Sequence, residues 1–185
     1  MPYDDSDMKI APNDPSELFD SSEGAATAFM RETQNGNMEK AKQLGAQFAS
    51  ELSAGDRGIV NFGVGAYDDG ATLLQRSVLF AYVVNQVVED LCPASIVAQS
   101  AMSSFYDCLR RDAPEVYERI TDNAVFSQYI LSVRSAPGDP SAIGKVFARL
   151  SGRENDALFV RYGCELSNYF TMYCTQLVLR MQLIR

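Results

Sequence analysis

Hydrophobic residues recur every three or four positions along most of this chain, the spacing that places them on one face of an α-helix. The breaks in this pattern coincide with Asn35-Gly36, Pro93 and Gly152, residues that end or interrupt helices. The pattern therefore predicts helices over about 15–34, 37–54, 71–91, 95–111, 115–134, 143–150 and 154–184.

β-branched residues occur only in short runs, and no two alternating segments flank a hairpin turn, so few or no strands are expected. Helices joined by short turns stack as antiparallel hairpins. The sequence therefore predicts an all-α fold of about seven helices, packed as antiparallel hairpins in a bundle or stack, with a long C-terminal helix. We expect residues 1–14 to form an acidic, irregular N-terminal segment and residues 15–185 to form a single all-helical domain.

Two of the expected helices have unusually wide apolar surfaces. The helix over 71–91 is apolar on most sides, which is typical of a helix in the middle of a fold or in a subunit interface. The last helix, about 30 residues at 1.5 Å each, would be roughly 45 Å long. A helix of that length serves as a central spine, or it protrudes and pairs with a second copy.

The segment Gly36-Asn37-Met38-Glu39-Lys40-Ala41 resembles the turn and second-helix start of a tetratricopeptide repeat. That family has a small residue at the position of Ala41, which lets two helices approach closely. The resemblance implies a TPR-like stack of helical hairpins, but it covers only about 30 residues, and no second copy follows at a period near 34. Gly45 stands where the family has an aromatic residue, so no family is claimed.

Charge is distributed unevenly along the chain. Residues 1–24 hold seven carboxylates and one lysine, so −6 of the formal net charge of −8 lies there and the body is almost neutral. Neither part has the basic surface that binds nucleic acid or anionic lipid, so neither partner is expected. No apolar stretch is long enough to span a bilayer, and the four cysteines form no C-x-x-C pair. We therefore expect free thiols and a cytoplasmic location.

The chain contains no histidine, which narrows the chemistry it can perform. Triads that use histidine as the general base are excluded, and the commonest metal ligand is missing. The four cysteines are too scattered to suggest a zinc site. We expect no metal and no cofactor, and a chain that is more readily explained without catalysis than as an enzyme.

Glycines crowd residues 55–70, directly before the helix over 71–91. A glycine-rich turn at a helix start can direct backbone N–H groups at an anion. However, the Gly-Lys-Ser/Thr of a P-loop is missing, and Asp68 and Asp69 would repel a phosphate. The spacing of a calcium loop is also missing. We interpret the stretch as a long connection in which Asp and Thr72 help to cap the next helix.

Candidate ligand-binding residues lie mainly on the last helix, where a stripe of tyrosines is interrupted by polar side chains. If this helix is buried, its polar residues need partners, for which two arginines on other helices are candidates, and such a cluster could line a pocket for a flat ligand. The alternative is that the tyrosines belong to the core and the polar residues face solvent. The candidate residues are Tyr162, Glu165, Asn168, Tyr169, Arg76 and Arg119.

Two functions from different classes remain open at this point. The first is a non-catalytic protein-interaction module that binds a protein partner or itself, which would make it a homodimer. The alternative is a small-molecule-binding or enzymatic helical domain with a Tyr/Glu/Arg-lined pocket. A further hypothesis is that the acidic segment over 1–14 docks onto a basic partner or nucleates assembly.

Overall fold

A computed structural model describes the backbone of residues 15–54, 60, 69–121 and 123–184. Within these ranges, side chains are described from residue 24 onward, apart from residues 123 and 124. The acidic segment expected over 1–14 and most of the connection expected over 55–70 lie outside the described residues.

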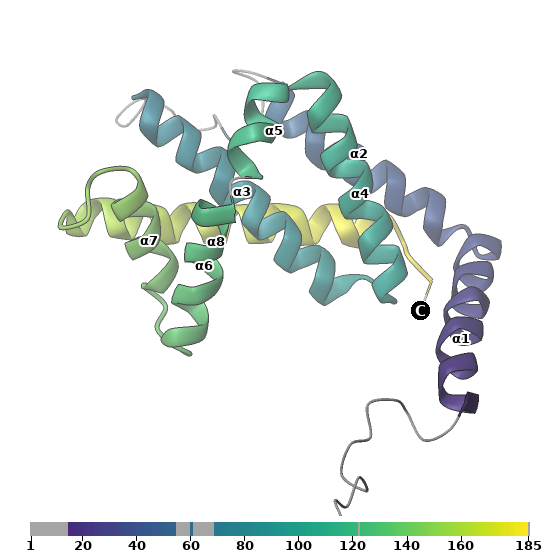
Figure 1. Cartoon of the computed structure of the whole chain (residues 1–185). Helices are drawn as coiled ribbons and strands as arrows, with labels where there is room; N and C mark the ends of the chain where they lie inside the picture. The colour runs from purple at the N-terminus through teal and green to yellow at the C-terminus, as the bar shows by residue number, and fades with distance from the viewer. Residues whose placement is uncertain (1–14, 55–59, 61–68, 122, 185) are drawn as a thin grey trace, which may run out of the picture.

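The described part of the chain is helical throughout and contains no strand, which confirms the all-α prediction (Figure 1). The wide apolar helix and the long C-terminal helix are both present. The helices are α1 (Pro15–Gln34), α2 (Asn37–Ser53), α3 (Gly70–Leu91), α4 (Ser95–Asp112), α5 (Pro114–Ile120), α6 (Asn123–Ser135), α7 (Ala142–Leu150) and α8 (Ala157–Arg180).

Two helix ends differ from the ranges that periodicity predicts. The helix expected over 115–134 is divided into α5 and α6, and the Thr121 hydroxyl bonds back to the Tyr117 carbonyl at 2.7 Å where α5 ends. Threonine, aspartate and asparagine follow one another over 121–123, and all three are poor helix formers. α8 stops at Arg180 rather than near 184, because Gln182 takes a positive φ of 50° and turns the chain.

α3 lies in the middle of the molecule, as its wide apolar surface predicts (Figure 1). Phe80 on α3 meets Phe48 of α2 edge-on, with ring centroids 6.4 Å apart, and Phe170 of α8 at 5.3 Å. All three rings are fully buried. This chain of edge-to-face contacts joins α2, α3 and α8 into one core.

α2 packs closely against α4, although α3 separates the two in sequence. A Cβ added to Gly45 of α2 would lie 2.1 Å from the Ala101 carbonyl oxygen and 2.8 Å from the Phe105 amide nitrogen of α4. The Ser104 hydroxyl also donates a hydrogen bond of 2.7 Å to the Lys42 carbonyl. Gly45, the departure from the tetratricopeptide pattern, is therefore the residue that lets these two backbones touch.

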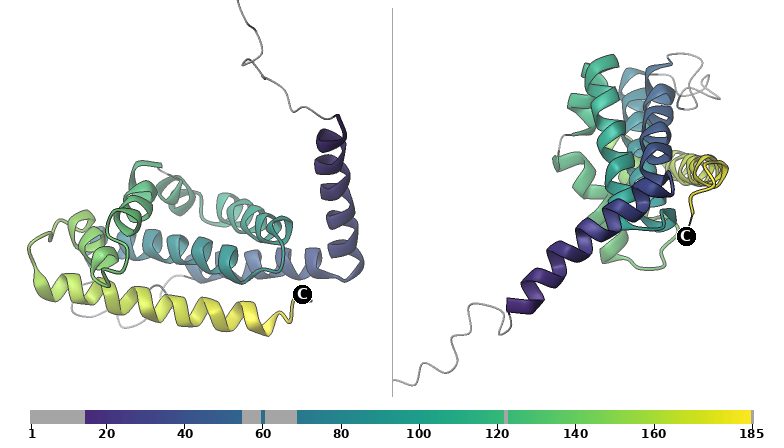
Figure 2. Two further views of the ribbon diagram at one scale, coloured as in Figure 1. Left: turned by 90° about the horizontal axis from the view of Figure 1, so that it is seen from below. Right: turned by 90° about the vertical axis from the view of Figure 1, so that its right-hand side faces the viewer.

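α1 does not fold back along α2, although the very short joint between them predicts an antiparallel pair. In both views of Figure 2, the N-terminal part of α1 projects away from the other helices. Gly36 links the two helices with a φ of 79°, and the hydrogen bonds around this turn hold α1 in its outward direction. The physical reason is therefore local, because the turn fixes the angle before any packing along α1 can do so.

Candidate functional site

Arg76 is the largest side chain that is buried almost completely, with 1% of its surface exposed. It projects from α3 and forms a hydrogen bond with Tyr162 of α8. Burial lowers the pKa of Arg76 because it penalises the charged form, while Tyr162 opposes that shift. Arginine remains protonated even so, because its ordinary pKa lies above 12. The pair therefore places a buried positive charge between α3 and α8.

Charged and aromatic groups surround the N-terminal ends of α3 and α8. The carboxylate of Asp69 caps α3 by accepting from the Thr72 amide at 3.0 Å and the Thr72 hydroxyl at 2.8 Å, which lowers the pKa of Asp69. This confirms the capping role expected for Thr72 and the aspartate before α3. Arg153 lies 3.7 Å from Asp69 and also sits over the Phe159 ring, 5.1 Å from its centre. The cluster ties the turn before α8 to the start of α3.

The tyrosine stripe of α8 makes a second polar contact nearer its C-terminal end. Tyr173 donates a short hydrogen bond to the carboxylate of Glu51, on α2. Burial raises the pKa of Tyr173, and the bond to Glu51 raises it further, so the phenol keeps its proton and acts as a donor. Tyr162 and Tyr173 therefore link α8 to α3 and α2, which is the core role that was the alternative to a ligand pocket.

The structure does not bring the six predicted ligand-binding residues together. Arg76 and Tyr162 meet, and Tyr169 is half-buried beside Phe170. Glu165 and Asn168 face solvent, and Glu165 pairs with Arg161 one turn away at 2.8 Å.

Arg119 is exposed on α5. Glu165 therefore follows the alternative of a solvent-facing stripe, and its ion-pair partner is Arg161 rather than Arg76 or Arg119, the candidates if α8 were buried here. The reason is that α8 turns this side outward, where an i,i+4 pair is the nearest available contact. Binding of a ligand by these residues stays a prediction.

Two hollows formed by the described residues are open grooves. One of about 780 Å³ lies over the turn before α8, between Arg149 and Leu158, and another of about 540 Å³ lies between α2 and α4. Within the described ranges, no three Cys, Asp or Glu side chains are grouped as a metal site would require. None of the described helices is long and apolar enough to cross a membrane.

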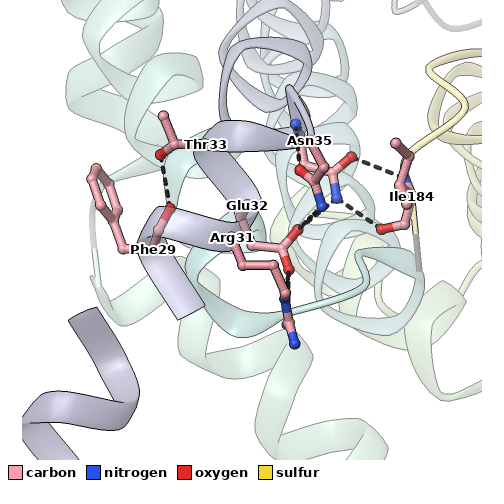
Figure 3. Close-up of polar contacts among 7 residues, drawn as sticks. Phe29, Arg31, Glu32, Thr33, Asn35 and Ile184 are labelled. Carbon is pink, nitrogen blue, oxygen red and sulfur yellow. Dashed lines mark hydrogen bonds and ion pairs between the residues drawn. The ribbon is translucent and has the colours of Figure 1, made fainter. Parts of the chain in front are cut away.

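A group of polar residues, of which Glu32 and Asn37 are buried, fixes the turn between α1 and α2 (Figure 3). The Glu32 carboxylate, only 2% exposed, accepts hydrogen bonds from Asn37 at 2.6 Å, Arg31 at 2.9 Å and Asn35 at 3.2 Å. These bonds, with that from Asn37 the strongest, lower the pKa of Glu32 against the opposing effect of burial. Glu32 is therefore held as a carboxylate at the base of α1.

The same turn holds the residues that follow α8. Asn37 is fully buried, and its amide donates to the Ile184 carbonyl at 2.8 Å while its oxygen accepts from the Ile184 amide at 2.9 Å. Lys40 donates to the Gln182 carbonyl at 2.8 Å. We call Glu32, Asn37 and Lys40, with the backbone of residues 182–184, the polar clasp. Sequence reasoning missed it, because a contact across 147 residues leaves no periodic signal.

Beyond the polar clasp, α1 carries apolar side chains in solvent. Phe29 is 48% exposed and Met30 is 61% exposed, and Gly24, Ala25 and Ala26 beside them are also exposed. A helix in a globular protein ordinarily buries its apolar stripe against the core. α1 therefore presents an apolar side that no other described helix covers.

Comparison with protein-family models, with curated proteins and with solved structures finds no match to this chain.

Proposed function

We propose that this chain is a non-catalytic interaction module and that α1 is the helix with which it binds a protein partner. The observation that carries the proposal is the exposure of Phe29 and Met30 on a helix that stands away from the body (Figure 2). Most helices in proteins are stabilised by the packing of an apolar face rather than by intrinsic propensity. Burial of a phenylalanine or methionine side chain on a partner contributes roughly 1.5–3 kcal/mol each.

The charge of the N-terminal region indicates what kind of partner surface α1 fits. Residues 1–24 carry a net charge of −6, and the apolar residues of α1 recur at helical spacing beyond them. Amphipathic helices of this kind bind in apolar grooves on their partners. The surface that complements α1 is therefore an apolar groove edged by lysine and arginine, and its association rate falls as salt rises.

The polar clasp supports this role because it anchors α1 at one end. An anchored helix loses less orientational freedom on binding than one attached through a flexible linker. Cys92, Cys108, Cys164 and Cys174 are all free, which supports a reducing, cytoplasmic setting for the interaction.

The experiment compares three forms of the full chain as bait in a cell lysate, with bound proteins quantified by mass spectrometry. The forms are wild type, the double variant Phe29→Ser/Met30→Ser, and Leu131→Ser, whose side chain is 63% exposed on α6 and so matches Met30. A partner that binds α1 is captured by wild type and Leu131→Ser, and the double variant loses it at least tenfold. A set of bound proteins that is the same for all three refutes the proposal.

A further inference from the structure

A cavity of about 340 Å³ lies between α3 and α6, which pack against each other. Its lining residues on α3 stand at positions i, i+3, i+4 and i+7, so they share one face of that helix. We call this hollow the α3–α6 cavity. It is lined by Tyr82, Asn85, Gln86 and Glu89 of α3 and, among the residues of α6, by Phe126 and Arg134.

The α3–α6 cavity lies where the central helix carries polar side chains. Between Val78 and Val88, the only amide or charged side chains of α3 are those of Asn85 and Gln86. Both are half-buried, and both line the cavity. Apolar residues at these two positions would let α6 pack onto α3 as the rest of the core does. The cavity is therefore a place where α3 keeps hydrogen-bonding groups at the expense of packing.

The polar groups around the cavity have no partners within the described part of the chain. The side-chain amides of Asn85 and Gln86 form no hydrogen bond with another described residue. Glu89 and Arg134 likewise form no ion pair among the described residues, although they carry opposite charges and line the same small cavity. Two amides, one carboxylate and one guanidinium are therefore available to a bound molecule.

Aromatic side chains form an apolar wall of the α3–α6 cavity. The Tyr82 side chain is almost completely buried and meets Phe126 edge-on, with ring centroids 5.8 Å apart. A further ring, that of the fully buried Tyr129, stacks on Tyr82 at 5.2 Å. Packing therefore holds this wall in place before any ligand arrives, and a preformed surface loses little freedom on binding.

From these lining groups, we infer that the α3–α6 cavity binds a small zwitterion with an apolar body, which is the chemistry of a free apolar amino acid. Arg134 binds the carboxylate through its planar fork of donors, and Glu89 accepts hydrogen bonds from the ammonium group. The apolar side chain of the ligand lies against Tyr82 and Phe126. Ligand cavities range from about 300 to 1,000 Å³, so one of about 340 Å³ suits a single amino acid rather than a nucleotide.

The two amides complete the site, because an amide both donates and accepts hydrogen bonds. The NH₂ groups of Asn85 and Gln86 donate to the carboxylate of the ligand, and their oxygens accept from its ammonium group. This site lies on α3 and α6, separate from α1. The inference therefore goes beyond the proposed interaction role and does not depend on it.

Two-dimensional NMR of the full chain, titrated with phenylalanine, tests the inference. We expect saturable shifts at the cavity-lining residues, with half-saturation on the order of 1 mM. The matched ligands are 3-phenylpropionate, which lacks the ammonium group, and 2-phenylethylamine, which lacks the carboxylate. Each should bind at least tenfold more weakly, because one charge at the cavity stays unpaired. No saturable shift with phenylalanine at ten times the expected concentration, or equal binding of all three compounds, overturns the inference.

Charge-neutralising variants assign each contact. Arg134→Gln should weaken phenylalanine binding at least tenfold and leave 2-phenylethylamine unchanged, because that ligand has no carboxylate. Glu89→Gln should weaken phenylalanine binding and leave 3-phenylpropionate unchanged. Asp90→Asn and Arg119→Gln remove the same charges at exposed positions outside the cavity and should bind phenylalanine as wild type does. Binding that is equally weak in the cavity variants and their controls overturns the inference.

The Phe29→Ser/Met30→Ser variant separates this inference from the proposed role of α1. That variant should bind phenylalanine as wild type does, whether or not it loses a protein partner. Loss of phenylalanine binding in that variant places the ligand at α1 and overturns the inference.

Discussion

Replacing Gly45 by alanine tests the close approach of α2 and α4. In an ordinary helix interior, alanine is more stable than glycine by about 1 kcal/mol. Here the new Cβ would lie 2.1 Å from the Ala101 oxygen, 2.8 Å from the Phe105 nitrogen and 2.9 Å from the Ser104 Cβ. Two of these three atoms belong to the backbone, so no side-chain rotation relieves the clash.

The expected cost of Gly45→Ala follows from the distance the helices must move. An ordinary contact begins near 3.4 Å and a tight one near 3.0 Å, so α2 and α4 must separate by about 1 Å along this line. Overpacking of a core costs typically 1–3 kcal/mol and more when backbone must shift. We expect Gly45→Ala to lower the free energy of unfolding by about 3 kcal/mol, which reverses the sign that helix propensity alone predicts.

Urea denaturation followed by circular dichroism measures this change. Gly24→Ala is the control, because Gly24 is also helical, is exposed on α1 and has no atom within 4 Å of an added Cβ. The control should raise helicity and should not lower the unfolding midpoint, because alanine is the better helix former where space is open. A Gly45→Ala protein as stable as wild type would refute the argument that the two backbones touch.

Three further predictions concern buried polar and thiol groups. Asn37→Leu removes the main hydrogen-bond donor to Glu32 and should lower the free energy of unfolding, measured in urea, by about 2–4 kcal/mol. Because the pKa of Glu32 is depressed in the folded state, its carboxylate stabilises the wild-type fold above the ordinary pKa near 4.5, and this stabilisation is lost as the pH falls. Glu32→Gln should abolish this pH dependence of stability. Gln75→Met removes a buried side-chain oxygen that has no hydrogen-bond partner in the described part of the chain, and should raise the free energy of unfolding by about 1 kcal/mol and with it the melting temperature. A melting temperature below that of wild type contradicts this. Burial raises the pKa of Cys92 to about 11 and raises that of Cys174 as well, so mass spectrometry after alkylation of native protein at pH 8 should find both unmodified, and rapid labelling of either would show an open core.

Periodicity predicts most helix ranges because most of these helices bury one continuous apolar face. It places α3 at the centre for the same reason, since α3 is apolar on most sides. It does not predict the pairing of α2 with α4, because the decisive residue, Gly45, contributes no hydrophobic signal. Its effect depends on which helix approaches it, and that is a property of the assembled fold.

The faces of α8 show the limit of this reasoning for the candidate site. Apolar residues occur on both sides of α8, so their spacing alone does not separate Phe159 and Phe170, which are buried, from Met172 and Leu179, which are exposed. The sequence leaves Glu165 and Asn168 open as buried site residues or as a solvent-facing stripe, and the structure places them in the stripe. Arg76 and Tyr162 do meet, because both lie where α3 and α8 pack.

The polar clasp also sets the order in which the molecule is completed. Asn37 and Ile184 are separated by 147 positions, so a nascent chain carries α1 and α2 long before the ribosome adds the residues that Asn37 holds. During that interval the turn at the base of α1 is held by its local hydrogen bonds, those to Glu32 among them, and the buried amide of Asn37 lacks its two bonds to Ile184. The turn therefore reaches its full set of hydrogen bonds only when the last helix is in place.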